Sequence, residues 1–378
     1  MKKFLLVLLV LCLSACASLV PTPPPMTEAP LPTATDSSLA LPRIDSPQLN
    51  QFYFINENDG WGMTAANVVR TNDGGVTWYN VTPLDVGQVG YASFVFNSAK
   101  EAFFLLPNVD YTSGTLYRTT NGGVTWITIP VPFAYASMQF LDSNNGFALA
   151  ALGAGAGSEA VALYKTGDGG MNWTLFFIND PSKDEYNDSL PLGGMKSGFS
   201  FLNASRGWVG GSVPVDNYIY LYATQNGGAT WIETKLALPA GYEMAQTGND
   251  APQFFSDTEG TLLVHMTLPS EPGLVTVAYR TTDGGFNWTP GQVIPRGRPA
   301  EFFSFNDGVA WGDGQFYVTR DAGQTWGAII PNENFSDRLV SFQFVNALTG
   351  WALTDSTGSD PSLYKTTDGG ATWTLIIP

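Results

Sequence analysis

One short motif recurs seven times along the chain, and this repetition constrains the fold more than any other feature. Each copy has the pattern Thr-x-Asp/Asn-Gly/Ala-Gly-x-Thr/Asn-Trp, and the copies begin at Thr71, Thr119, Thr166, Thr224, Thr281, Thr319 and Thr366. Their central acidic or amide residues are separated by 48, 47, 58, 57, 38 and 47 residues. Repeats of this length are typical of propellers and solenoids.

Each repeat also contains four short segments with the two-residue alternation of a β-strand. In the last repeat these segments lie at 341–344, 350–353, 363–366 and 373–375. The innermost strand carries an apolar alternation, mostly Phe-x-Phe, which we expect at 52–54, 94–96, 138–140, 199–201, 253–255, 303–305 and 342–344. A period of two excludes a helical solenoid. We therefore predict an all-β fold, a seven-bladed β-propeller over residues 49–378, with no second domain.

The composition suits short strands joined by tight turns, with 41 Gly and 25 Pro. Charged residues make up 13% of the 378 residues, half of the ~25% that is usual. The formal net charge of −16 opposes binding to phosphate backbones, so we exclude DNA and RNA as partners. With one histidine, His265, and two cysteines, Cys12 and Cys16, we expect no Ser-His-Asp triad, no His-rich zinc site and no CxxC motif. We expect no catalytic residues, no metal and no cofactor.

The first 48 residues predict export and a membrane anchor. Lys2 and Lys3 precede a ten-residue apolar run, which is too short for the ~20 residues of a membrane-spanning helix. Leu13-Ser14-Ala15-Cys16 resembles the bacterial lipobox, whose cysteine becomes the lipidated first residue. We expect a signal peptide over 1–15, lipid on Cys16 and a Pro/Thr-rich tether over 16–48, of which residues 39–44 could instead dock on the propeller as an extra strand. This predicts anchoring to the outer face of the cell membrane, or to an outer membrane if the organism has one.

The repeated turn resembles the Asp-box, or BNR repeat, of sialidase-type propellers, sortilin ectodomains, some endoglucanases and the photosystem II stability and assembly factor family. Turn chemistry gives it a structural reason, because Asp or Asn accepts backbone N–H bonds and Gly adopts positive φ angles. The expected acceptors are Asp73, Asn121, Asp168, Asn226, Asp283, Asp321 and Asp368. The tryptophans expected to cap the core between blades are Trp78, Trp126, Trp173, Trp231, Trp288, Trp326 and Trp373.

The remaining tryptophans leave none for a ligand. We expect Trp61, Trp208, Trp311 and Trp351 to occupy one equivalent place in the second strand of their blades. Carbohydrate sites often use a spare tryptophan as a stacking platform, so a sugar site in this chain would depend on Tyr or Phe.

Function is expected on the face opposite the Asp-box turns, where the longest loops span 178–197, 239–253 and 265–276. Candidate binding residues on this face are Tyr186, Tyr242, Glu243, Arg296, Arg298 and Arg338. We expect His265 at a strand end beside it. Residues 184–188 form an acidic loop that lacks the full pattern of a calcium site, and we expect it to be solvated.

A sialidase resemblance would imply three arginines on the substrate carboxylate, a Tyr–Glu nucleophile pair and an Asp acid. That family's first arginine motif is matched here only by Arg43-Ile44. Tyr242 and Glu243 are sequence neighbours, and neighbours on an extended chain point opposite ways.

The assembly-factor family is the nearer resemblance and covers residues 49–378. It implies a non-catalytic scaffold that docks on membrane-protein subunits, often with a lipoprotein anchor. That family tends to place arginines at the starts of innermost strands, whereas here only Arg298 and Arg338 lie there.

These features predict a monomeric, membrane-tethered, extracytoplasmic propeller that binds a protein or an envelope polymer without chemistry. One alternative is a glycan-binding or sialidase-like glycoside-hydrolase propeller, which requires Arg296, Arg298, Arg338 and a Tyr/Glu pair to converge in one pocket. Another is a structural surface lipoprotein, which predicts no concave site on the loop face.

Overall fold

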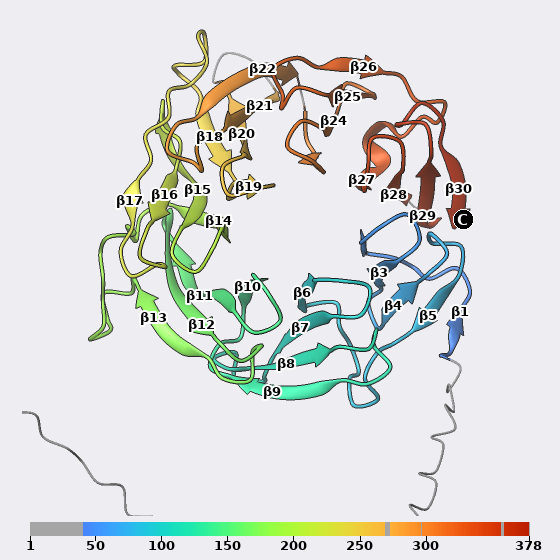
Figure 1. Cartoon of the computed structure of the whole chain (residues 1–378), viewed down its shortest axis with the longest axis horizontal. Coiled ribbons are helices and arrows are strands. Elements are labelled where there is room, and N and C mark those ends of the chain that lie inside the picture. The colour runs from blue at the N-terminus through green and yellow to red at the C-terminus, as the bar shows by residue number, and fades with distance from the viewer. Residues whose placement is uncertain (1–40, 269–272, 296, 357–358, 378) are drawn as a thin grey trace, which may run out of the picture. The chain divides into compact units, whose positions relative to one another are not determined.

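The computed structural model describes residues 41–268, 273–295, 297–356 and 359–377. These residues form antiparallel β-sheets arranged as seven blades around a common centre (Figure 1). This confirms the all-β, seven-bladed propeller predicted from the repeats. The predicted signal peptide, Cys16 and residues 16–40 of the predicted tether lie outside the described residues. None of the helical structure within the described ranges is long and apolar enough to cross a bilayer.

In blades 1 to 3 the chain moves outward from the innermost strand through an antiparallel meander. Blade 1 contains β2 (Gln51–Phe54), β3 (Gly60–Met63), β4 (Val68–Thr71) and β5 (Trp78–Asn80). Blade 2 contains β6 (Ser93–Phe96), β7 (Ala102–Pro107), β8 (Gly114–Thr119) and β9 (Ile127–Val131). Blade 3 contains β10 (Ala136–Phe140), β11 (Gly146–Gly155), β12 (Ser158–Thr166) and β13 (Thr174–Ile178). A fifth strand, β1 (Arg43–Ile44), pairs with β5 at the outer edge of blade 1. The compact propeller unit therefore begins at Leu41, inside the stretch assigned from sequence to the tether.

Blades 4 and 5 are joined into one sheet. Their strands are β14 (Met195–Phe201), β15 (Gly207–Asp216), β16 (Leu221–Thr224), β17 (Ile232–Glu233), β18 (Gln246–Asn249), β19 (Gln253–Phe254), β20 (Gly260–Thr267), β21 (Leu274–Thr281) and β22 (Thr289–Pro295). The joint is β18, which pairs with β15 of blade 4 and with β20 of blade 5. The prediction of a continuous loop over 239–253 is therefore wrong, because residues 246–249 fill the space between two long strands.

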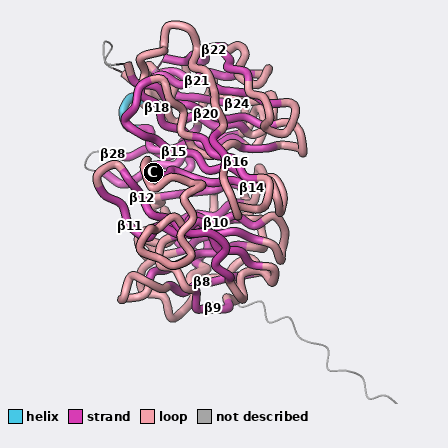
Figure 2. Tube along the Cα trace, turned by 90° about the vertical axis from the view of Figure 1, so that its left-hand side faces the viewer, coloured by secondary structure: helices cyan, strands magenta, loops and turns pink. Residues whose placement is uncertain are grey.

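Blades 6 and 7 return to the four-stranded form. They contain β23 (Ala300–Phe302), β24 (Gly308–Gly312), β25 (Gln315–Thr319), β26 (Gly327–Ile329), β27 (Leu339–Phe344), β28 (Gly350–Ser356), β29 (Ser359–Thr366) and β30 (Thr374–Ile377). A short 3-10 helix, η1 (Ser336–Arg338), precedes β27. The edge-on view of Figure 2 shows strands in the interior of the ring and loops on both faces.

A phenylalanine over a glycine defines the inner part of six blades. The Phe54 ring lies so close to Gly60 that a Cβ there would be 2.6 Å from the ring, and only glycine leaves this space. The equivalent pairs are Phe140/Gly146, Phe201/Gly207, Phe254/Gly260, Phe302/Gly308 and Phe344/Gly350. This register corrects the innermost strand of blade 6, predicted at 303–305. Phe303 and Ser304 instead donate their N–H groups to Asp307 O within a turn.

The seven repeated turns, called box turns below, are closed by their own side chains. In blade 1 the Thr71 hydroxyl donates to Asp73 over 2.9 Å and accepts from Gly75 N over 2.9 Å, while Thr77 N donates to Asp73 over 2.8 Å. The same bonds recur in the other six turns. Gly74 and Gly75 have φ angles of +75° and +95°, which explains the glycine pair.

The box tryptophans differ in burial. Trp78, Trp231 and Trp373 are buried, whereas Trp126, Trp173, Trp288 and Trp326 stay partly accessible. The other four tryptophans are buried, but the predicted equivalence is wrong for Trp311. Trp61, Trp208 and Trp351 follow the first glycine of their strand, whereas Trp311 lies two residues further along β24. Its indole still packs in the core, against Phe316 and Phe335.

Side chains of the innermost strands link neighbouring blades. Gln139 Oε1 accepts from Phe201 N over 2.6 Å, and its amide donates to Phe201 O over 3.0 Å. Gln343 makes the same pair of bonds to Phe54, over 2.6 and 2.9 Å. Glu301 occupies the equivalent place in blade 6 and accepts from Phe344 N over 2.5 Å.

Basic side chains link the blades a second time near the box turns. Arg118 of blade 2 donates to Gly169 O in blade 3 over 3.0 Å, and Arg206 of blade 4 donates to Gly284 O in blade 5 over 3.0 Å. The sequence places Arg118 directly before a box turn, but its reach into the next blade could not be inferred from the sequence.

Candidate functional site

The two faces of the ring differ in how their polar groups are used. On the box face, each box turn donates a backbone N–H to the turn between the first two strands of its blade, as from Gly74 to Asn58 O over 2.8 Å. Hydrogen bonds, first that from the backbone N–H of Asn287, lower the pKa of the Asp283 carboxyl to about 2. The opposite face, called the loop face below, carries the connections between blades and those between second and third strands.

Among the described residues of the loop face, two hollows of similar size are found. The tyrosine hollow has a volume of ≈ 390 Å³ and is lined by Gln88, Tyr91, Leu106, Pro107, Asn108, Val109, Tyr111 and Tyr135. The arginine hollow, of ≈ 410 Å³, lies over the joined blades 4 and 5, and its lining includes Thr247, His265 and Arg298. This face therefore has concave sites, contrary to the expectation for a purely structural lipoprotein.

Arg298 is the one charged side chain among the described residues that line the arginine hollow. His265 Nδ1 lies 2.8 Å from the hydroxyl of Thr276, and burial together with the charge of Arg298 lowers the histidine pKa to about 4. Burial also raises the pKa of the nearby Asp250 carboxyl, while Arg298 lowers it. At neutral pH the histidine carries no charge, so the hollow offers one guanidinium to an anionic group such as a carboxylate.

The structure does not bring the other candidate residues to Arg298. Arg338 pairs with Glu333 over 3.3 Å and donates to Asn334 O over 2.7 Å. Glu243 accepts from Gly241 N of its own loop over 3.1 Å, and Tyr242 packs against the apolar core of blades 4 and 5. Arg296 lies outside the described residues. Among the residues that are described, the arrangement that sialidase chemistry requires is therefore not assembled.

The loop that carries Tyr186 turns away from the arginine hollow. Asn187 donates to Ala229 O over 3.0 Å, and Ser189 accepts from Trp231 N over 3.1 Å, so this loop packs beside the box turn of blade 4. Lys196 fixes its far end by donating to four backbone carbonyls. Tyr186 therefore lies on a fixed, peripheral loop, and the long insertion covers the joint between two blades.

The acidic residues 184–188 are exposed to solvent, apart from Asn187, which is partly buried. No three His, Cys, Asp or Glu side chains gather into a possible metal site within the described parts of the chain.

Sequence reasoning missed the tyrosine hollow, because its residues come from three separate connections. Tyr91 precedes β6, Tyr135 precedes β10, and Tyr111 lies between β7 and β8. The available signal was the recurrence of tyrosine just before two successive innermost strands. The third tyrosine, on a neighbouring loop, could be added only after the blades were placed.

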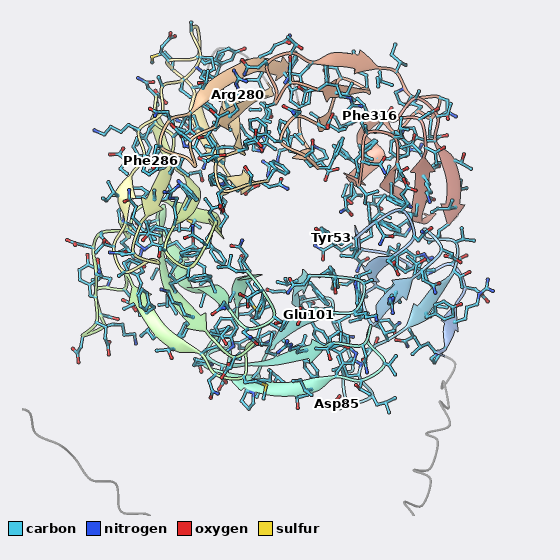
Figure 3. All side chains as sticks on the ribbon, viewed as in Figure 1. Tyr53, Asp85, Glu101, Arg280, Phe286 and Phe316 are labelled. Atoms are coloured by element: carbon cyan, nitrogen blue, oxygen red, sulfur yellow. The ribbon has the colours of Figure 1, made fainter. Side chains whose placement is uncertain are left out.

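A third hollow, of ≈ 370 Å³, lies along the innermost strands and is lined by residues that include Tyr53, Glu301 and Gln343. Figure 3 shows Tyr53 pointing toward the centre of the ring. Burial raises the pKa of the Glu301 carboxyl to about 8, although its bond from Phe344 N acts in the opposite direction. Glu301 is therefore largely protonated at neutral pH and serves the contact between blades 6 and 7.

Comparisons with known proteins agree with this architecture. No protein-family model matches the chain, and no curated protein matches it. Among solved structures, YCF48 bound to D1 peptide matches 87% of this chain and 97% of its own, with a TM-score of 0.53 and 17% identity. The GH74 xyloglucanase from Xanthomonas campestris matches 89% of this chain and 56% of its own, with a TM-score of 0.58 and 12% identity. Oligogalacturonate lyase from Vibrio parahaemolyticus matches 87% and 91%, with a TM-score of 0.56 and 9% identity.

The chain is a β-propeller. At these identities the likeness concerns the fold alone, and the matched proteins include an enzyme on polysaccharide and a protein with a bound peptide. The function of this propeller must therefore be argued from its own surfaces.

Proposed function

We propose that this protein is a non-catalytic binding propeller, tethered to a membrane outside the cytoplasm by lipid on Cys16. Its loop face docks a protein or an envelope polymer and so assists the assembly or stability of a membrane or envelope complex. The observation that carries the proposal is the contrast between the faces: open side chains and two hollows on the loop face, and internally bonded turns on the box face.

The titratable groups near the loop face support binding rather than chemistry. His265 is neutral and hydrogen-bonded to Thr276, and Arg338 is paired with Glu333. A general acid or base needs a pKa near the working pH, and a histidine with a pKa of about 4 does not meet this need at neutral pH. Arg298 remains as an exposed cation for an acidic group of a partner.

The Asp-box resemblance and the likeness to YCF48 support a protein as the partner. YCF48 was solved with a D1 peptide, so a propeller of this fold holds a segment of another protein. The present chain differs from the assembly-factor pattern in its net charge of −16 and its few arginines. We therefore propose a membrane or envelope protein as the partner and assign no photosystem subunit.

In-cell crosslinking of the tagged full-length protein, followed by mass spectrometry of solubilised membranes, tests the proposal. We expect one membrane or envelope complex, crosslinked through loop-face residues, and reduced recovery with Arg298→Ala. Cys16→Ser is the matched test of the anchor and should move the protein out of the membrane fraction. Recovery of lipoprotein-sorting machinery alone, or crosslinks confined to the box face, would overturn the proposed function.

A further inference from the structure

The tyrosine hollow presents three exposed aromatic rings on blades 2 and 3. Tyr91, Tyr111 and Tyr135 are 82%, 67% and 43% exposed. The rings of Tyr111 and Tyr135 are nearly parallel, with planes 6° apart and centroids 6.4 Å apart. Leu106, Pro107 and Val109 complete the walls of the hollow, so flat apolar surfaces surround an open space of ≈ 390 Å³. Large rings left in water at one point of a rigid scaffold indicate a contact surface.

Tyr111 is held in a backbone conformation that a bulky residue rarely adopts. Its φ angle is +55°, in the left-handed region. The loop around it is pinned on both sides, because Asp110 accepts from Thr112 N over 3.0 Å and Asn108 donates to the Ser113 hydroxyl over 3.0 Å. The ring is therefore presented by a rigid loop that tolerates strain at this residue.

The polar groups of the hollow are uncharged and open. None of its eight lining residues carries a charge, and the whole chain has a net charge of −16, which disfavours an anionic ligand. Over the described residues, the three tyrosine hydroxyls and the Gln88 amide have no hydrogen-bond partner. The hollow thus combines flat apolar faces with four free polar groups at their edges.

The size of the hollow restricts the ligand further. A stable protein interface uses ~20–30 residues on each side, whereas eight residues line this hollow. Its volume lies at the lower end of the range for small-ligand sites. A pyranose ring fits this chemistry, because its C–H face is apolar and carries partial positive charge toward an aromatic face, while its rim carries hydroxyls.

We propose that the tyrosine hollow binds a neutral glycan, with sugar rings stacked on Tyr91, Tyr111 and Tyr135. This inference rests on the proposed function in one respect, namely that the loop face is the binding face. It adds a second ligand at a site separate from the arginine hollow. A propeller with both sites would hold a polysaccharide of the envelope beside its protein partner.

Isothermal titration of the full-length, detergent-solubilised protein tests the proposal. The probes are cellohexaose, laminarihexaose and mannohexaose, with hexagalacturonate as the charged counterpart. We expect at least one neutral hexasaccharide to bind more tightly than hexagalacturonate. Tyr91→Ala, Tyr111→Gly and Tyr135→Ala should each weaken that binding by roughly tenfold, which corresponds to the loss of one stacked aromatic.

Two variants separate lost binding from lost folding. Phe286→Ala removes an aromatic of 58% exposure on the box face and should bind the glycan as the wild type does. Tyr111→Gly places at φ +55° the residue that tolerates it best, so its thermal unfolding temperature should be no lower than that of the wild type.

Two outcomes would overturn the glycan site: no binding of any neutral hexasaccharide, or binding unchanged in all three tyrosine variants. Crosslinking in the tyrosine variants separates this failure from that of the proposed function. Recovery of the membrane complex without glycan binding would contradict the glycan site and leave the proposed function supported. Glycan binding without any recovered complex would support the glycan site and contradict the proposed docking of a protein.

Discussion

The ring of Phe54 lies flat against the indole of Trp351, with centroids 3.6 Å apart and planes 5° from parallel. Phe54 ends the innermost strand of blade 1, and Trp351 belongs to β28 of blade 7, so the first and last blades meet in this stack. Phe147 and Phe201 make the same contact between blades 3 and 4, at 3.7 Å and 2°. Among the described strands, β1 pairs with β5 of its own blade and none crosses between blades 1 and 7. Side-chain contacts therefore close the ring.

The seam between blades 7 and 1 should open more readily than an internal joint. Gln343→Ala and Gln139→Ala each remove an equivalent pair of hydrogen bonds between innermost strands. Each pair contributes about 1–3 kcal/mol to the free energy of unfolding. Blades 3 and 4 stay linked by the chain from β13 to β14, whereas blades 7 and 1 have no such link. Hydrogen exchange should therefore accelerate more in β2 and β27 of Gln343→Ala than in β10 and β14 of Gln139→Ala. Equal acceleration in the two variants would contradict closure by side chains alone.

Trp373→Ala should destabilise the protein by about 3–5 kcal/mol, as expected for the loss of a large buried aromatic. The indole is buried, donates to Gly370 O over 2.9 Å and packs against Phe316, Phe335 and Phe344. Trp326→Ala is the matched control, because its indole is partly accessible and its Nε1 has no hydrogen-bond partner. Chemical denaturation should show a smaller loss in the free energy of unfolding for Trp326→Ala than for Trp373→Ala. A loss below about 1 kcal/mol for Trp373→Ala would mean that burial of the box tryptophan matters little.

The repeat allowed the fold to be predicted from sequence, because seven copies of a turn with known backbone requirements indicate seven blades. Register was harder to read where apolar residues are adjacent. In blade 6, Phe302, Phe303 and Phe305 all satisfy an apolar pattern, and only the pairing of Phe302 with Gly308 distinguishes them. Residues 39–44 could be interpreted from sequence as tether or as an extra strand, and the two residues of β1 are too few to decide between these alternatives.

The candidate site was less predictable than the fold. Arg298 was identified because it is a cation near the start of an innermost strand. Arg338 satisfies the same rule, but its pairing with Glu333 depends on η1, which the sequence pattern did not indicate. The tyrosine hollow depends on the relative placement of three loops. Such contacts between distant residues follow from the ring geometry and have no local sequence pattern.

The box turns should tolerate Asn in place of Asp and resist Ala. Asn121 and Asn226 accept the same bonds as their acidic counterparts. Asp283→Asn should therefore preserve stability at neutral pH, whereas Asp283→Ala should cost about 1 kcal/mol through lost hydrogen bonds. Because the folded pKa is about 2, below the unfolded value of 3.8, the ionised form stabilises the fold above pH 3.8. This stabilisation is lost as pH falls through about 2. Acid titration should show a smaller loss in Asp283→Asn than in the wild type, because the other box aspartates, whose pKa values are also lowered, still titrate in the variant.

Glu301→Gln should change how stability depends on pH. Glu301 occupies the place in blade 6 that Gln343 and Gln139 occupy in blades 7 and 3, and both glutamines bond the N–H and the C=O of the next blade. A protonated carboxyl resembles the glutamine amide because it combines an acceptor with a donor. Ionisation removes the donor and leaves a charge beside Phe344, so we expect the contact between blades 6 and 7 to weaken.

The direction in which stability changes with pH follows from the folded and unfolded pKa values of Glu301. The carboxyl ionises near 4.5 when unfolded and near 8 when folded, so between these values the folded state holds the extra proton. The stabilisation is complete below pH 4.5. The free energy of unfolding falls as pH rises from 4.5 through 8, by at most about 1.4 kcal/mol per pH unit. Thermal unfolding from pH 5 to 9 should show this decline in the wild type and a flatter profile in Glu301→Gln, with the variant more stable at pH 8. Parallel profiles would mean that Glu301 is ionised in the folded ring throughout this range.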